Sequence, residues 1–315
     1  MFERLSLPTP FQVGPVNAYL AGRTIADPGP DSEEAWSRLL DALDARDLGP
    51  SDIEQVLITH PHPDHFGAAH RFRAEGARVL ASPETATIVE DFSGRLEYEQ
   101  SYFQSFFQRC GMDRTTAATV TDLPTAFLEY APSVEVDRSL SPTDSLEVAG
   151  RTVTVDALAG HAAGELLFEY RDGDDRVALV GDNVLAEITP NPFLLPPDEN
   201  GNPRPRVLPA YNDSLDSLRE EEHDRFLPGH RDPITDPRIR IDEIRAAHED
   251  RTERVATLLE QPMTPVEVMH ELFGDLPATE AFSGMSEAVG HLDVLERRGR
   301  ATVSDRGGLL VYETS

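Results

Sequence analysis

The segment Thr59-His60-Pro61-His62-Pro63-Asp64-His65 decides the fold of this chain. It follows the stretch 53–59, whose β-branched residues predict a buried strand. In an extended segment His60 and His62 lie on one side, and the turn after them brings Asp64 and His65 toward the same point. Imidazole and carboxylate groups without cysteine form a nitrogen and oxygen site that suits Zn²⁺, Mn²⁺ or Fe. The segment therefore predicts a metal site at the end of a strand.

Further histidine and aspartate motifs follow in order along the chain. They are Ala157-Leu158-Ala159-Gly160-His161, Leu179-Val180-Gly181-Asp182 and Phe226-Leu227-Pro228-Gly229-His230. Two more lie near the start: Val16-Asn17-Ala18-Tyr19-Leu20 and Ile25-Ala26-Asp27-Pro28-Gly29. Together with the His-x-His-x-Asp-His segment, these motifs resemble those of the metallo-β-lactamase-fold hydrolases. The resemblance covers residues 10–240 and is to the glyoxalase II branch in particular.

The resemblance implies a dinuclear metal centre. His60, His62 and His161 would hold one metal, Asp64, His65 and His230 would hold the second, and Asp182 would bridge them. Two divalent ions, most simply Zn²⁺ with Mn²⁺ or Fe as alternatives, would share a metal-bound hydroxide that attacks the substrate. Asp64 would orient the attacking water or accept its proton. Asp27 would not bind a metal itself but would orient the imidazole of a metal ligand.

Alternating strands and helices predict a layered α/β fold, which the resemblance specifies as an αββα metallo-β-lactamase sandwich. Residues 1–238 form the expected hydrolase domain, with a helical insertion at 84–133. In residues 239–315 three helices, at 240–260, 264–273 and 285–298, precede a two-strand hairpin with a turn at 305–308. That order predicts a winged helix at the C-terminus.

Aromatic residues in the insertion and nearby loops are candidates for substrate contacts. Tyr102 and Phe106 lie four residues apart and share one helical face, which either packs on the core or lines a pocket over the metals. The proline-rich segment 189–197 presents Asn191 and Phe193, and Tyr211 follows it. We predict that these five residues contact substrate.

The composition excludes several classes of protein. The chain has 315 residues and a net charge of −29, and all 28 basic residues are arginine. An acidic, lysine-free composition is typical of proteins from a very salty cytoplasm, as in a halophilic archaeon, because salt screens the self-repulsion. The single Cys110 excludes a disulfide framework, and no apolar stretch is long enough to span a membrane. No secretion signal is evident at the N-terminus, so we expect a cytoplasmic protein.

Three functions remain open. The first is a dinuclear-metal hydrolase of a small ester or thioester, similar to hydroxyacylglutathione hydrolases. The second is a phosphodiesterase or endoribonuclease of the same fold. The third is a winged-helix nucleic-acid-binding protein with a metal-sensing domain, which Arg297, Arg298, Arg300 and Arg306 suggest but which the acidic surface argues against. We expect a small-molecule substrate, and a homodimer is a hypothesis that rests on similar proteins alone.

Overall fold

The chain divides into two compact units. The structure, a computed structural model, describes residues 1–198 and 201–315. Unit 1 comprises Met1–Ser93, Ala126–Pro190 and Ser217–Ile241, and unit 2 comprises Gly94–Thr125, Asn191–Asp216 and Asp242–Ser315. This division differs from the sequence-based boundary at residue 238, because 94–125 of the helical insertion belongs with the C-terminal helices.

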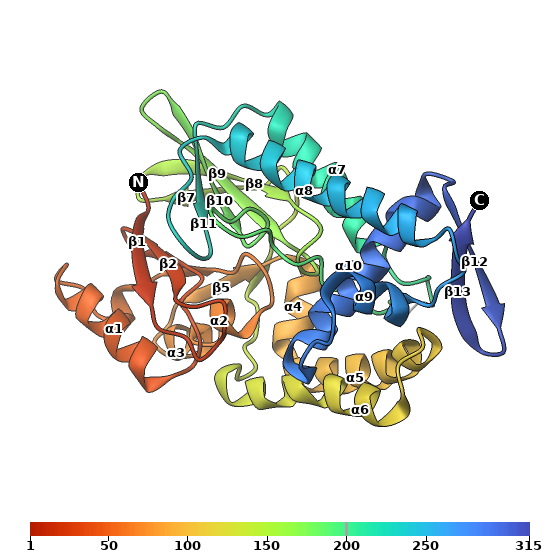
Figure 1. The fold of residues 1–315 in the computed structure, drawn as a ribbon. Coiled ribbons are helices and arrows are strands. Elements are labelled where there is room, and N and C mark those ends of the chain that lie inside the picture. Colours follow the sequence, from red (N-terminus) through yellow and green to blue (C-terminus); the bar gives the residue numbers. More distant parts are fainter. Residues whose placement is uncertain (199–200) are drawn as a thin grey trace. The chain divides into compact units, whose positions relative to one another are not determined.

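Unit 1 contains two β-sheets (Figure 1). The first has the order β1 (Glu3–Leu7), β2 (Val16–Ala21), β3 (Thr24–Ala26), β4 (Gln55–Leu57), β5 (Arg78–Ala81) and β6 (Arg138–Ser139). The second has the order β11 (Arg225–Pro228), β10 (Asp175–Gly181), β9 (Leu166–Asp172), β8 (Arg151–Ala157) and β7 (Ser145–Val148). β3, β4, β5 and β6 run parallel, as do β10 and β11, so their carboxyl ends share an edge in each sheet.

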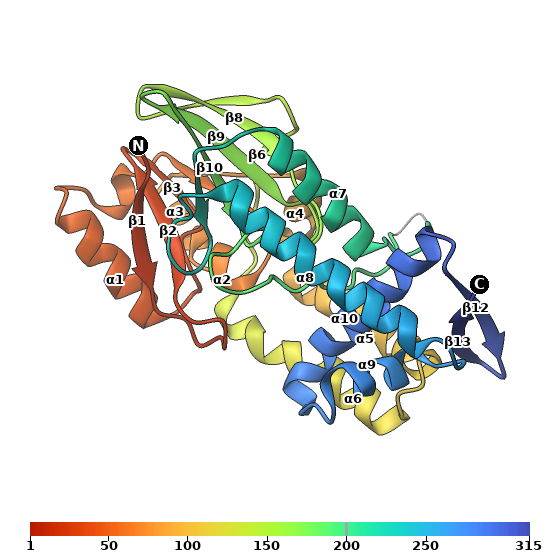
Figure 2. The same ribbon diagram turned by 45° about the horizontal axis from the view of Figure 1, so that its top comes forward.

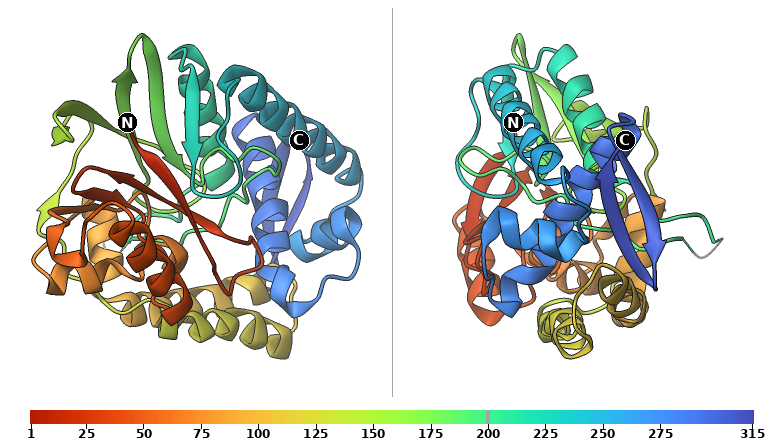
Figure 3. Two further views of the ribbon diagram at one scale, coloured as in Figure 1. Left: turned by 90° about the vertical axis from the view of Figure 1, so that its left-hand side faces the viewer. Right: turned by 45° about the vertical axis from the view of Figure 1, so that its right-hand side comes forward.

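The core of unit 1 lies between these sheets (Figure 3). Tyr19 and Leu57 from the first sheet belong to one buried cluster with Phe168 and Leu179 from the second. Because side chains alternate along a strand, each sheet contributes one apolar face to this cluster. The result is a two-layer sandwich whose strand ends can present polar groups.

Helices cover the first sheet and connect its strands. They are α1 (Glu33–Asp44), η1 (Pro50–Asp52), α2 (Pro63–Phe66), α3 (Ala69–Ala74), α4 (Pro83–Glu90) and η2 (Leu123–Tyr130). Ser32 caps α1 by accepting the N–H of Ala35, and the rings of Trp36 and Phe72 join α1 to α3. α2 and α3 are two short helices, and the turn between them contains Gly67.

Unit 2 is mainly helical (Figure 2). Most of its residues lie in α5 (Phe92–Arg109), α6 (Arg114–Asp122), α7 (Val207–Glu220), α8 (Pro237–Leu258), α9 (Pro265–Phe273), α10 (Ala278–Arg297), and the hairpin of β12 (Ala301–Arg306) and β13 (Leu309–Thr314). The three C-terminal helices and the hairpin thus occur where the sequence predicts them. α10 begins at Ala278, earlier than the expected residue 285.

The aromatic face of α5 packs within the core of unit 2. Phe103 and Phe107 are buried, and both rings meet the ring of Phe282 on α10. Cys110 is buried in the same cluster. Phe106 is buried in this cluster and Tyr102 packs against it, so the alternative that this face packs on a core is confirmed for both. Among the described residues, no helix is both long and apolar enough to cross a membrane.

Candidate metal centre

The metal loop takes its shape from two prolines and a glycine. After β4 the chain bends at Thr59 and His60, and His62, which precedes α2, is extended at φ −83° and ψ 143°. Pro61 and Pro63 fix their own φ angles and disfavour helix in the residue before each. Gly67 closes the turn, since a Cβ there would lie 2.0 Å from the carbonyl oxygen of Tyr130.

The loop places two imidazoles beside a third from the other sheet. Nδ1 of His62 lies 3.1 Å from Nε2 of His60 and 3.1 Å from Nε2 of His161. The ligand atoms of these residues lie within 4.8 Å of one another. The predicted first ligand set is therefore brought together in unit 1.

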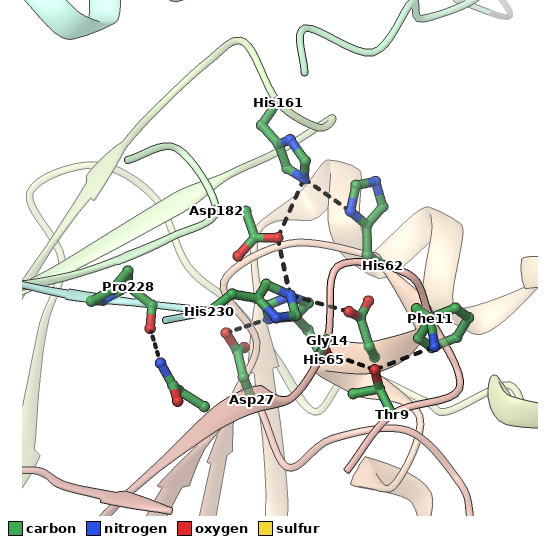
Figure 4. A network of polar contacts seen from close by, with 12 residues as sticks. Thr9, Phe11, Gly14, Asp27, His62, His65, His161, Asp182, Pro228 and His230 are labelled. Carbon is green, nitrogen blue, oxygen red and sulfur yellow. Dashed lines mark hydrogen bonds and ion pairs between the residues drawn. The ribbon is translucent and has the colours of Figure 1, made fainter. Parts of the chain in front are cut away.

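The predicted second set also converges, and Asp182 lies between the two sets (Figure 4). Nε2 of His230 lies 3.2 Å from Oδ2 of Asp64. Oδ2 of Asp182 lies 3.6 Å from Nε2 of His161 in the first set, and 3.5 Å and 3.4 Å from Nε2 of His65 and His230 in the second. One carboxylate oxygen thus faces both sets.

Two glycines allow this close approach. Asp182 and His230 follow the adjacent parallel strands β10 and β11, each after a glycine. A Cβ at Gly229 would lie 2.2 Å from Oδ1 of Asp182 and 2.6 Å from Cε1 of His65. At Gly181 the backbone φ is +50°, and a Cβ would lie 2.9 Å from Oγ1 of Thr59. Neither position has room for a side chain.

Asp27 and Thr59 orient two of the imidazoles. Asp27 accepts hydrogen bonds from Nδ1 of His65 (2.9 Å), and from the backbone N–H (2.8 Å) and hydroxyl (2.7 Å) of Thr59. Because its hydrogen goes to Asp27, the Thr59 hydroxyl accepts from Nδ1 of His60 at 2.9 Å. Both histidines therefore carry their proton on Nδ1 and keep Nε2 available as a ligand.

The opening strand fixes the final histidine. Nδ1 of His230 donates to the carbonyl oxygen of Pro15 at 2.8 Å. Asn17 and Tyr19 on β2 donate to the carbonyl oxygen of Pro228 at 2.9 and 2.7 Å. The turn that carries His230 is thereby held against the first sheet, and its Nε2 faces the ligand sets.

The buried charges of the centre favour a cation. Burial and, next, the neighbouring His161 together lower the pKa of His62 to about 3. Burial also lowers the pKa of His230, but Asp182 and Asp64 outweigh it and raise that pKa to about 9. Burial raises the pKa of Asp182, but His230 and His65 outweigh it and hold it well below its usual value. Asp182 is therefore ionised, and its negative charge raises the pKa of His230, so the same carboxylate would also attract a metal cation.

Unsatisfied polar atoms show that the residues fit such ions. Nε2 of His65, Nε2 of His230 and Oδ1 of Asp182 are buried and accept or donate no hydrogen bond within residues 1–198 and 201–315. Buried polar atoms are normally paired, so these atoms need a further partner. A divalent cation would be such a partner.

A separate group in unit 1, formed by Glu169, Glu221 and His223, also brings potential ligands together. Here Arg176 already pairs with Glu169 at 2.6 Å, and His223 lies 2.8 Å from the same carboxylate. These distances are those of charge-assisted hydrogen bonds. Ion pairing accounts for this group without a metal.

The predicted substrate-contacting residues all belong to unit 2, whereas the predicted metal ligands all belong to unit 1. Tyr102 stacks on Phe106 with ring centroids 5.7 Å apart, and Asn191 donates to the carbonyl oxygen of Ser283 at 3.4 Å. Phe193 lies near the ring of Phe282, and Tyr211 is fully buried against His248. Contact with substrate stays a prediction for these five residues.

Sequence reasoning missed three residues around the centre: Thr59, Glu165 and Asn183. Thr59 was visible as the residue that opens the histidine segment. Glu165 and Asn183 are buried, each beside a motif that had been recognised. A buried acid directly before an apolar strand is a usable signal, because such an acid needs hydrogen-bond partners.

Two stacked sheets with histidines and aspartates gathered at their strand ends define the class of metal-dependent hydrolases. The sequence model of the metallo-beta-lactamase superfamily matches residues 12–230, and the chain belongs to this superfamily. The chain is 32% identical to the probable metallo-hydrolase YqjP of Bacillus subtilis over 316 residues, which is 98% of this chain and 97% of that protein.

Solved structures extend this similarity. A metallo-beta-lactamase family protein from Thermus thermophilus shares 26% identity and a TM-score of 0.81, with 100% of this chain and 98% of that chain covered. A beta-lactamase domain protein from Burkholderia ambifaria has a TM-score of 0.79 at 24% identity, over 100% of this chain and 92% of the other, and shows the fold alone. Both matches span the two units described above.

Proposed function

We propose that the protein is a dinuclear-metal hydrolase of a small ester or thioester, similar to hydroxyacylglutathione hydrolases, and that its native metal is Zn²⁺. The position of Asp182 carries this proposal, because one oxygen lies within 3.6 Å of His161 on one side and of His65 and His230 on the other. His60, His62 and His161 would hold one ion, and Asp64, His65 and His230 the second. A donor set of imidazole and carboxylate without cysteine suits zinc.

Two ions held by these residues would supply an activated water at neutral pH and would polarise the oxygen of the attacked carbonyl. Oδ2 of Asp64 would orient the attacking water and accept its proton. Asp27 and Thr59 would keep the imidazoles in the tautomer that leaves Nε2 free. Asp182 would fix the separation between the two ligand sets.

The arginines of the C-terminal region favour a small substrate over a nucleic acid. We propose a winged-helix-like module for residues 239–315 that packs or dimerises. Its arginines already have carboxylate partners: Arg297 with Asp213, Arg298 with Glu249, Arg300 with Glu253 and Arg306 with Glu313. Paired arginines leave little free positive charge for phosphates. The acidic, lysine-free composition of the chain supports the separate proposal that the protein functions in a salty cytoplasm.

The test is metal content by elemental analysis on protein purified in high KCl, combined with a panel of thioester, ester, lactone, β-lactam and phosphodiester substrates. We expect two metal equivalents per chain and turnover of a thioester or ester that a chelator abolishes. Two equivalents with cleavage of the phosphodiester alone would replace the proposal with the nuclease alternative. A chain that binds no metal would refute both.

A further inference from the structure

Glu165 is a buried carboxylate beside the metal centre, and the proposed reaction gives it no part. It lies between the His161 loop and β9, and its exposed fraction is 3%. Its Oε2 accepts the backbone N–H of His161 at 3.1 Å. The backbone N–H of Ala162 also donates to this carboxylate. Burial of an acid costs free energy unless hydrogen-bond donors compensate for the lost water. The side chain of Glu165 and the two N–H groups therefore stabilise one another.

Asn183 links the same carboxylate to the second strand end. It follows Asp182 directly and is fully buried. Its Nδ2 lies 3.3 Å from Oε2 of Glu165 and donates to the carbonyl oxygen of Ala159 at 3.1 Å. The loop of His161 and the turn of Asp182 are thus joined through Glu165 and Asn183.

The far end of the His161 loop is fixed independently. The carbonyl oxygen of Gly164 accepts hydrogen bonds from the hydroxyls of Ser82 (2.7 Å) and Thr85 (3.1 Å) at the start of α4. A Cβ at Gly164 would lie 2.4 Å from Oγ of Ser82, so the backbone approaches α4 closely. With that end held, the position of His161 depends on the Glu165 side chain.

We propose that Glu165 is a positioning residue of the metal centre, which holds the backbone of His161 and, through Asn183, the turn of Asp182, so that both side chains face the same point. This inference rests on the proposed metal assignment. Glu165 touches neither metal nor substrate. It acts on the geometry of the ligands, as outer hydrogen-bond partners of metal ligands do.

The test uses Co²⁺ as the probe, because its visible absorption reports ligand geometry. Glu165→Gln keeps the size of the side chain but turns an NH₂ group toward the N–H donors of His161 or Ala162. We expect about 10- to 100-fold weaker Co²⁺ binding in chelator competition and an altered absorption spectrum. Glu165→Ala should show a loss at least as large. The matched control is Glu187→Gln, an exposed glutamate of unit 1, which should leave binding and spectrum unchanged.

Each outcome decides between the proposals. Glu165→Gln with wild-type Co²⁺ affinity and an unchanged spectrum would overturn the positioning role and leave the metal centre intact. If Glu165→Ala does not fold, as judged by far-UV circular dichroism, the size-matched glutamine variant decides alone. A wild-type chain that binds no Co²⁺ would overturn the metal centre together with this inference.

Discussion

The carboxylate of Asp27 lies 2.9 Å from Nδ1 of His65, and its backbone has a φ of +49°. The left-handed backbone directs the side chain under the histidine segment, where it also accepts two hydrogen bonds from Thr59. A single acid therefore sets the orientation of His65 directly and of His60 through a hydroxyl. Such outer contacts determine how tightly a metal is held.

Replacement of Asp27 by asparagine should weaken metal binding by about 10- to 100-fold, because an amide cannot accept all three hydrogen bonds. Asparagine tolerates the left-handed backbone nearly as well as aspartate, so the fold should persist. Chelator competition measures the affinity. Asp47→Asn is the matched control, since Asp47 is exposed and also has a positive φ, of 55°. Equal affinities in the two variants would refute this role of Asp27.

The hydroxyl of Thr59 should contribute more to metal affinity than its methyl group. Thr59→Val removes the acceptor for Nδ1 of His60 and leaves the buried Asp27 without one donor. We expect Thr59→Val to bind metal more weakly than wild type, and Thr59→Ser to bind nearly as well. Isothermal titration with Zn²⁺ distinguishes the two. Valine and serine variants of equal affinity would show that the hydroxyl is dispensable.

Asp182→Ala should cost the protein its second metal equivalent. The carboxylate is the group that both ligand sets share, so its loss leaves neither set complete. Elemental analysis after gel filtration measures the content, and circular dichroism checks the fold. Asp174→Ala, in the exposed turn between β9 and β10, is the control. Two equivalents retained in Asp182→Ala would exclude a bridging role.

Cys110 should react with thiol reagents only when unit 2 opens. Burial raises its pKa to about 12, and its side chain is fully buried in the aromatic and aliphatic cluster of unit 2. At pH 8 about 0.01% of such a thiol is thiolate, which is the reactive form. We expect no labelling by a thiol-reactive dye in native buffer and one dye per chain in guanidinium chloride. Rapid labelling of the native protein would contradict this burial.

The melting temperature should rise with salt. The chain carries a net charge of −29, and screening of its self-repulsion increases as the Debye length falls from about 10 Å at 0.1 M to about 3 Å at 1 M salt. Thermal melts in increasing KCl measure the effect. Parallel melts in sucrose control for osmolyte stabilisation. A melting temperature that falls with KCl would mean that the ion pairs contribute more than the repulsion.

The local motifs could be predicted from the sequence because each consists of consecutive residues at a strand end. The apolar strands β4 and β10 could be predicted for the same reason. β1 was not predicted, because only Leu5 and Leu7 of its five residues are buried. Two apolar residues are too few to identify the alternating pattern of a strand. The early start of α10 was missed because Gly284 lowers helix propensity. There a Cβ would lie 2.4 Å from Leu276, so tertiary packing requires the glycine.

The partners of the ligands could not be predicted in the same way. Glu165 and Asn183 lie 18 residues apart in sequence, and their contact depends on how β9 and β10 emerge from the sheet. The assignment of residues 94–125 to the C-terminal unit could not be predicted either. It depends on which residues pack against buried side chains such as Phe107 and Leu272. Periodicity identifies a buried face, but it does not identify what covers that face.

The two glycines that precede Asp182 and His230 provide a criterion for classifying relatives. A natural or designed chain that keeps the histidine segment but has alanine in place of Gly229 would place a methyl group 2.2 Å from Oδ1 of Asp182. It would have to give up that carboxylate or displace His65, and so would lose the shared ligand. Glycine at both positions is therefore a marker, readable without any structure, of which homologues can still accommodate a pair of metal ions.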